Sequence, residues 1–227
     1  ASAIEPLSQA AAGEVSDLAS PVGFSDSELK GLLATVGETG TGKGAGGEGP
    51  AAAKVQPKTK TQFLGSSSSG QRFAFVIDNS GSMKSSGKFD LARTELYRAI
   101  SMMKPYNYFY VVFYSDRPYP MFEPEVEKDM VAATPANVQK LYQWLAKMET
   151  NSGGKAPDAV ELCVKLKPDV IYLLTDGKYY GNQVEDISRM CKAAKIPVNT
   201  IGLKTEEGIE GLKTIAEKTG GQFLYVP

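Results

Sequence analysis

The sequence has no histidine and only two cysteines, Cys163 and Cys191, among its 227 residues. Histidine and cysteine supply most zinc ligands, and histidine is the usual base of Ser-His-Asp triads and Cys-His dyads. Their scarcity excludes most hydrolase chemistry and favours a protein that is not an enzyme. Because cysteine is commonly a small core residue, we expect two buried free thiols, with a disulfide between two predicted helices as the alternative.

An excess of charge of either sign is also missing. The chain has 25 basic and 26 acidic residues and an isoelectric point of about 5.7. This balance gives no support to a nucleic-acid partner or to an anionic membrane surface as a partner. No apolar run approaches the roughly 20 residues that a helix needs to cross a bilayer, so we expect no membrane-spanning helix.

The first part of the chain differs from the rest in composition. Residues 1–60 are rich in alanine, glycine, serine and glutamate, with the densest glycine between Gly37 and Gly47. This composition predicts an extended, low-complexity arm. Inside it, residues 25–36 have the cap and the apolar spacing of a short amphipathic helix, which could dock on this domain or on a neighbour.

The arm also contains a near match to a phosphate-binding loop, from Gly37 to Gly44. The motif needs a serine or threonine hydroxyl for magnesium at its last position, and here that position is Gly44. The residues that follow cannot open the helix whose amino terminus receives the phosphates. We therefore expect no bound nucleotide.

Residues 61–227 alternate between predicted strands and helices, which is typical of an α/β domain. We expect a Rossmann-like, open, mostly parallel six-stranded sheet with one short antiparallel edge strand and helices on both faces. The strands are expected at residues 72–77, 108–114, 118–122, 170–175, 198–203 and 223–226. A short leading strand at 61–64 precedes a predicted loop, Gly65–Gly70. In the helix that starts at Thr134, Trp144 lies off the apolar stripe and is expected to be partly exposed.

Polar residues follow the first of these strands at a regular spacing. The apolar run of residues 72–77 stops at Asp78, and Ser80 and Ser82 follow at alternate positions. A buried parallel strand presents its functional groups at its carboxyl end. One carboxylate and two hydroxyls are oxygen ligands of the kind that Mg²⁺ and Mn²⁺ prefer. The alternative is a polar turn that caps the next helix.

A second strand, which begins at Val170, ends at Asp176. Together the two motifs resemble the metal-ion-dependent adhesion site of the von Willebrand factor type A family. In that family the aspartate after the second strand gives the metal a further carboxylate. The resemblance therefore implies Mg²⁺, or alternatively Mn²⁺ or Ca²⁺, bound by Asp78, Ser80, Ser82 and Asp176.

The sequence departs from the family pattern after Gly153–Gly154, where Lys155 stands in place of the expected threonine. A second lysine, Lys178, lies just beyond the second strand. In one interpretation Lys155 turns to solvent, and Thr150 or Ser152 supplies the missing oxygen. In the other, the ammonium of Lys155 takes the place of the cation and pairs with both aspartates.

The resemblance implies a function in protein binding. In the family, the cation accepts an acidic side chain from a partner protein, so we expect a non-enzymatic interaction or adhesion module. The alternative is a structural assembly subunit with a degenerate, metal-free site, whose amino-terminal arm makes contacts between copies in a homo-oligomer. Phe63–Gly65, Lys167–Asp169 and Gly220–Val226 look most like a bacterial branch. The adhesive family, together with a start of the chain that looks processed, favours the bacterial cell envelope or a secreted setting over the cytoplasm.

Overall fold

The computed structural model describes residues 57–177, 179–204 and 206–227. The predicted helix at 25–36, the near match to a phosphate-binding loop and almost all of the predicted arm lie outside these residues. Within them, no helix combines the length and the apolar character needed to cross a membrane.

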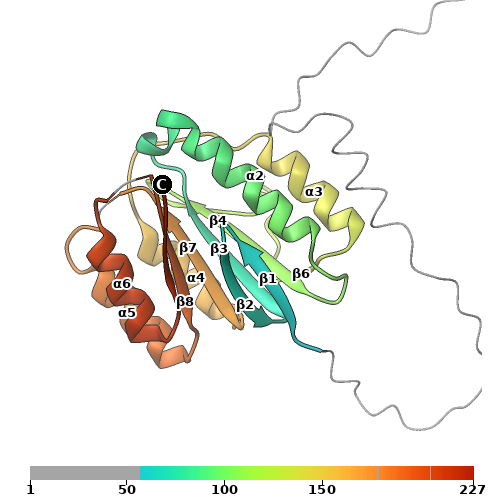
Figure 1. Ribbon diagram of the computed structural model, residues 1–227. Coiled ribbons are helices and arrows are strands. Elements are labelled where there is room, and N and C mark those ends of the chain that lie inside the picture. The colour runs from blue at the N-terminus through green and yellow to red at the C-terminus, as the bar shows by residue number, and fades with distance from the viewer. Residues whose placement is uncertain (1–56, 178, 205) are drawn as a thin grey trace, which may run out of the picture.

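The main sheet is open and mostly parallel (Figure 1), with the strand order β5-β4-β3-β7-β8-β9. Its central strands pair in parallel, whereas β5 and a further short strand, β6, pair with β4 in antiparallel fashion. This confirms the predicted fold class, and β6 is an addition to the six expected strands. The strands are β3 (Arg72–Asp78), β4 (Tyr108–Tyr114), β5 (Pro118–Pro120), β6 (Val131–Ala132), β7 (Val170–Thr175), β8 (Val198–Leu203) and β9 (Phe223–Val226).

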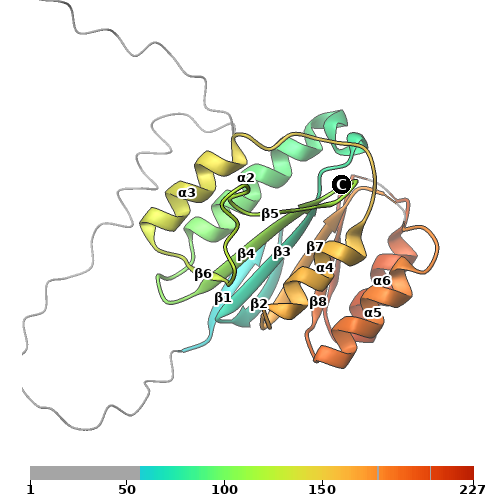
Figure 2. The same cartoon turned by 180° about the vertical axis from the view of Figure 1, so that it is seen from behind.

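Helices cover both faces of the sheet, which explains why β7 and β8 are buried along their whole length. Figure 1 shows α2 in front of the sheet, and Figure 2, from behind, shows α4 and α5 on the opposite face. The helix α3 packs beside α2, and α6 packs against α5 and β8. The helices are α2 (Lys88–Ser101), α3 (Pro135–Leu145), α4 (Ala156–Lys165), α5 (Gln183–Ala194) and α6 (Ile209–Thr219).

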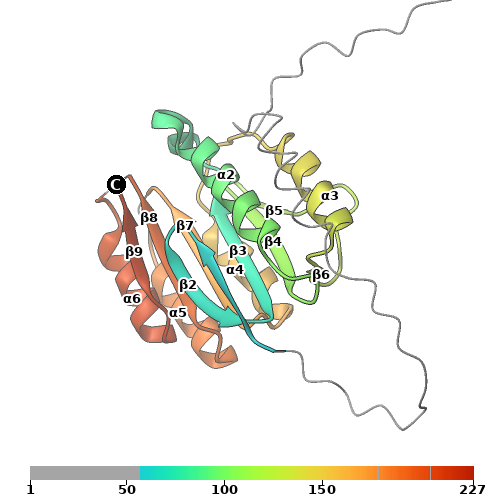
Figure 3. The ribbon, with the colours of Figure 1, turned by 45° about the vertical axis from the view of Figure 1, so that its right-hand side comes forward.

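A two-stranded hairpin, β1 (Thr59–Phe63) and β2 (Ser66–Gly70), lies on the same face as α2 (Figure 3). The prediction that Gly65–Gly70 is a loop was therefore wrong. Four consecutive serines show no apolar alternation, but the β2 backbone pairs with β1, and Asn199 of β8 donates a hydrogen bond to the Ser68 hydroxyl at 2.8 Å. Backbone pairing and one side-chain contact thus hold a strand without an apolar pattern.

The expected exposure of Trp144 was also wrong, because its side chain is 7% exposed. Its ring contacts Phe113 of β4 and Phe122, at centroid distances of 5.6 and 6.3 Å. The chain after β5 covers the flank of α3 that would otherwise face solvent. The prediction for the cysteines is confirmed, since Cys163 and Cys191 are both buried and free.

Candidate functional site

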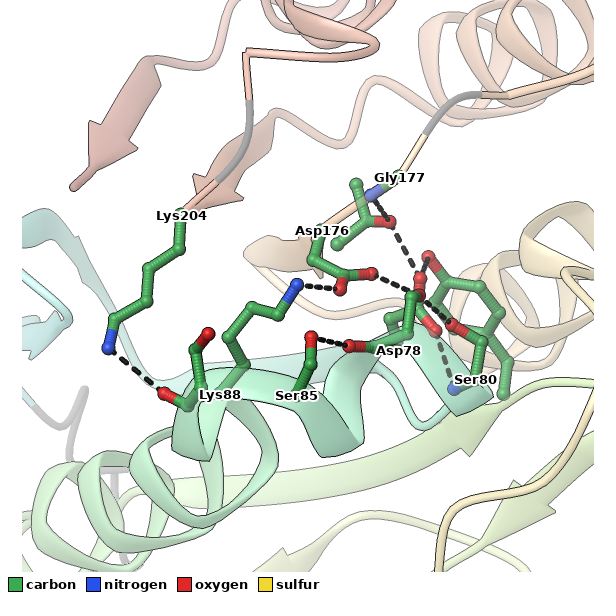
Figure 4. Close-up of polar contacts among 11 residues, drawn as sticks. Asp78, Ser80, Ser85, Lys88, Asp176, Gly177 and Lys204 are labelled. Atoms are coloured by element: carbon green, nitrogen blue, oxygen red, sulfur yellow. Dashed lines mark hydrogen bonds and ion pairs between the residues drawn. The ribbon is translucent and has the colours of Figure 1, made fainter.

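The two strand-end motifs meet at the carboxyl edge of the sheet (Figure 4). Asp78 ends β3, and a 3₁₀ segment, η1 (Gly81–Gly87), follows it. The Ser80 Oγ lies 3.0 Å from the Ser82 Oγ, and the Ser82 hydroxyl donates to Asp176 Oδ1 at 2.7 Å. Residues separated by almost a hundred positions in the sequence thus form one continuous set of oxygen atoms.

Asp78 is held from several sides. Its Oδ1 accepts the Ser80 backbone N–H at 2.7 Å, and its Oδ2 accepts the Thr175 hydroxyl at 2.7 Å and the Tyr114 hydroxyl at 3.4 Å. Asp78 is 5% exposed, and this burial raises the pKa of its carboxyl group, while the bonds from Ser80 and Thr175 oppose the increase. The side chain is therefore a fixed part of the edge of the sheet.

Asp176 is paired with a lysine that sequence reasoning missed. The Nζ of Lys88, the first residue of α2, lies 2.5 Å from Asp176 Oδ2. The Lys88 side chain is 10% exposed and that of Asp176 is fully buried. The sequence held one hint, because Lys88 lies in the first turn of α2, where the helix dipole disfavours a positive charge, but nothing in the sequence named Asp176 as its partner.

The lysine that pairs with Asp176 is thus Lys88, whereas the sequence suggests Lys155 as the lysine that could pair with the aspartates. Lys155 is exposed, and its backbone N–H donates to the Ser115 carbonyl at 2.9 Å. No ion pair of Lys155 with another described residue is formed. Lys178, the second lysine considered, lies outside the described residues.

An open hollow of about 930 Å³ adjoins these groups. All four predicted metal ligands line it, together with Ser152 and Lys155. Thr150 lines a different hollow, together with Arg93 and Glu149. Of the two residues considered as a source of an extra oxygen, Ser152 is therefore the one at the site.

Further polar residues line the same hollow and were missed from the sequence: Asp116, Tyr180, Gln183 and Glu207. Asp78 is the last residue of β3, and Asp116 lies two residues beyond the end of β4, so a search for acids at the carboxyl ends of the strands would have found both. The hydroxyl of Tyr119 donates to Asp116 at 2.6 Å, and this bond lowers the pKa of Asp116. The charged residues that line the hollow are thus four acids, Asp78, Asp116, Asp176 and Glu207, and one lysine, Lys155.

The donor atoms match a hard divalent cation in kind. Carboxylate and hydroxyl oxygens are suitable ligands, and Mg²⁺ commonly keeps several waters besides one or two carboxylates. Within the described residues, no group of three or more acidic, cysteine or histidine side chains could hold a metal ion. A cation here would thus depend on two carboxylates, the serine hydroxyls and water.

Several solved structures share the fold. A von Willebrand factor type A protein from Catenulispora acidiphila matches with a TM-score of 0.61 and 17% identity, over 71% of this chain and 40% of that one. Proximal thread matrix protein 1 from the mussel byssus matches with a TM-score of 0.53 and 20% identity, over 68% of this chain and 41% of that one. The SpRpn10 VWA domain matches with a TM-score of 0.52 and 14% identity, over 70% of this chain and 88% of that one.

At these identities the likeness shows the fold alone, and the chain spans about two fifths of the length of the first two proteins. None of the curated proteins compared with the sequence matches it. The model of the von Willebrand factor type A domain, in contrast, matches residues 73–227, which include both strand-end motifs. The chain therefore belongs to the von Willebrand factor type A domain family.

Proposed function

We propose that the domain is a non-enzymatic protein-binding module whose partner binds at the hollow beside the carboxyl edge of the sheet. In this proposal four residues hold a divalent cation, Mg²⁺ or alternatively Mn²⁺ or Ca²⁺: Asp78, Ser80, Ser82 and Asp176. An acidic side chain of the partner protein completes the coordination of that cation. The domain itself carries out no chemical step.

The observation that carries the proposal is the continuous set of oxygen atoms at this edge. The hydroxyls of Ser80 and Ser82 lie 3.0 Å apart, and the second donates to Asp176 at 2.7 Å. The hollow next to them, of about 930 Å³, has room for a side chain of a partner. Because four acids and only one lysine line it, an acidic partner would be repelled unless a cation supplied positive charge.

The serine hydroxyls are the best positions for a test, because Asp78 is buried and its removal would disturb the sheet. We expect the Ser80→Ala, Ser82→Ala double variant to bind Mg²⁺ and Mn²⁺ at least about tenfold more weakly by calorimetry. Ser69→Ala, at an exposed position of β2, is the matched control and should bind as the wild type does. Equal cation affinity in the double variant and the wild type would contradict the proposal.

The acidic group of the partner needs a separate measurement. Immobilised peptides that contain Asp or Glu, beside the same peptides with Asn or Gln, give a direct comparison. We expect the wild-type chain to be retained by the acidic peptides alone, and a chelator to release it. If the chelator left the retained amount unchanged, the result would argue against a bridging cation.

A second candidate function is a structural subunit that assembles without a metal. The ion pair of Lys88 with Asp176 favours it, because this pair balances one carboxylate without a bound cation. In this candidate, residues 1–56 make contacts between copies of the chain. Light scattering in the presence of a chelator tests it on two proteins, the full chain and a chain without residues 1–56. The full chain should form assemblies larger than a single copy, and the shortened chain should not.

A further inference from the structure

Lys88 stands at a position that is costly for a lysine. It is the first residue of α2, where the helix dipole disfavours a positive charge, and only 8% of its surface is exposed. Moving an ammonium group out of water carries a desolvation cost that a close acidic partner must offset. Within the described residues, Asp176 is the acid that provides this compensation, at 2.5 Å.

The pair leaves the two oxygens of Asp176 with different roles. Oδ1 accepts the Ser82 hydroxyl on the side of the predicted ligands, whereas Oδ2 is buried and contacts the Lys88 ammonium. Oδ2 has no hydrogen-bond partner among the described residues, so the ammonium is its compensation. Lys88 therefore both orients the carboxylate and cancels its charge.

The loop that carries Ser82 is fixed by contacts that need no cation (Figure 4). The Ser85 hydroxyl donates to the Ser82 carbonyl at 2.8 Å, and the Nζ of Lys204 donates to the Ser86 carbonyl at 3.2 Å. The first bond lies within η1, the second links η1 to the end of β8, and the Lys88 ion pair links the start of α2 to the end of β7. The site is thus assembled by the chain itself.

We propose that Lys88 is a permanent counter-ion of Asp176, which keeps this loop folded without a divalent cation and weakens the binding of that cation. The inference rests on the proposed function and concerns how strongly its site binds the metal. With Lys88 in place, the two aspartates and the ammonium carry a net charge of one negative unit instead of two. A divalent cation is attracted less strongly by that smaller charge.

Calorimetric titration of the full chain with Mg²⁺ tests the effect on affinity. Lys88→Met removes the charge and keeps most of the side-chain length, and we expect it to bind Mg²⁺ at least about tenfold more tightly than the wild type. Lys84→Met is the matched control, because Lys84 is an exposed lysine of η1, four residues before Lys88. It should stay within about twofold of the wild type.

Thermal melting in a chelator and in saturating Mg²⁺ gives the second readout. We expect Lys88→Met to melt well below the wild type in the chelator, because a buried carboxylate is then unpaired. Mg²⁺ should restore most of this loss, whereas the wild type and Lys84→Met should change little. If Lys88→Met is insoluble in the chelator, Lys88→Gln, which keeps a donor for Oδ2, takes its place.

The outcomes separate this inference from the proposed function. A folded Lys88 variant with the Mg²⁺ affinity of the wild type would overturn the inference and leave the proposed function intact. Variants that stay unfolded even in saturating Mg²⁺ would overturn it as well, because the cation would then not replace the ammonium. If neither the wild type nor the Lys88 variant bound Mg²⁺, the proposed function itself would fail.

Discussion

Gly153 lets the loop before α4 lie against the end of β4. Its φ of +122° is a conformation that other residues rarely adopt, and an added Cβ would lie 2.5 Å from the backbone nitrogen of Asp116. At Gly154, the next residue, an added Cβ would meet no atom within 4 Å. The close approach brings Ser152 and Lys155 to the hollow, so one glycine shapes one wall of the site.

We expect Gly153→Ala to lower the free energy of unfolding by about 2 kcal/mol or more, because both the backbone strain and the clash oppose the native loop. Gly154→Ala is the matched control and should change it by less than about 1 kcal/mol. Urea unfolding of the three proteins measures the difference. Similar losses for both variants would mean that the loop adapts and that the contact with Asp116 is not required.

The buried thiols make stability depend on alkaline pH. Burial raises the pKa of Cys191 to about 12 and that of Cys163 above its usual range, with nearby Cys191 as a second cause. Above about pH 8.5 the unfolded chain loses the thiol proton while the folded chain keeps it. The stability contributed by each neutral thiol is therefore complete below that pH and decreases as the pH rises, by about 1.4 kcal/mol per unit.

We expect the free energy of unfolding of Cys191→Ala to fall about 1 kcal/mol less than that of the wild type between pH 8.5 and pH 9.5. This window lies below the usual pKa of tyrosine, near 10, which limits the contribution of the buried phenols. Urea unfolding at both pH values measures the slope for each protein. Equal slopes would mean that Cys191 reaches solvent in the native state.

At the scale of the elements, the β1–β2 hairpin is anchored to the sheet through one aromatic residue. Phe63 is 1% exposed, and its ring packs edge-on against Phe75 of β3 and Tyr172 of β7, with centroids 5.4 and 5.9 Å away. The Tyr172 hydroxyl also donates to the Thr61 carbonyl at 3.0 Å. The hairpin thus covers a part of the sheet that α2 leaves open.

We expect Phe63→Ala to lower the free energy of unfolding by about 3 to 5 kcal/mol, since it leaves a cavity above two central strands. Phe63→Leu keeps most of the apolar volume and should cost less than about 1.5 kcal/mol. Gln62→Ala, at the exposed neighbouring position, is the control and should stay within about 0.5 kcal/mol. A small loss for Phe63→Ala would show that the hairpin contributes little to the stability of the sheet.

The elements that sequence reasoning predicted well are those with a strong local signal. Continuous apolar runs marked β3 and β7, and Thr134 and Gly220 marked a helix start and a helix end that the structure confirms. The strand β2 has no such signal, because its serines pair through the backbone. The burial of Trp144 was not predicted, because it depends on Phe122, which lies outside the helix that carries Trp144.

The candidate site shows the same division between local and tertiary information. Asp78 and Asp176 could be predicted to lie close together, because parallel neighbouring strands end at one edge of the sheet. The partner of Asp176 could not be derived from strand ends, since Lys88 reaches the edge from the start of a helix. Asp116 lies two residues beyond β4 and lines the same hollow, so the position of strand ends could have predicted it as well.

At the scale of the whole molecule, the described residues share one hydrophobic core. A single cluster joins Phe63 of the hairpin, side chains on both faces of the sheet, and residues of all the described helices. Trp144 lies on the side of α2 and α3, whereas Cys163 and Cys191 lie on α4 and α5. These three residues therefore report on the two layers that enclose the sheet, in a chain with one tryptophan and two cysteines.

We expect the two layers to unfold together, because neither can keep its apolar face covered once the shared sheet is lost. Tryptophan fluorescence in urea follows the first layer, and thiol labelling at the same urea concentrations follows the second. The two midpoints should agree within about 0.3 M, and circular dichroism should give the same value. An earlier midpoint for the thiols would mean that α4 and α5 detach first, and that the core is two cooperative units joined at the sheet.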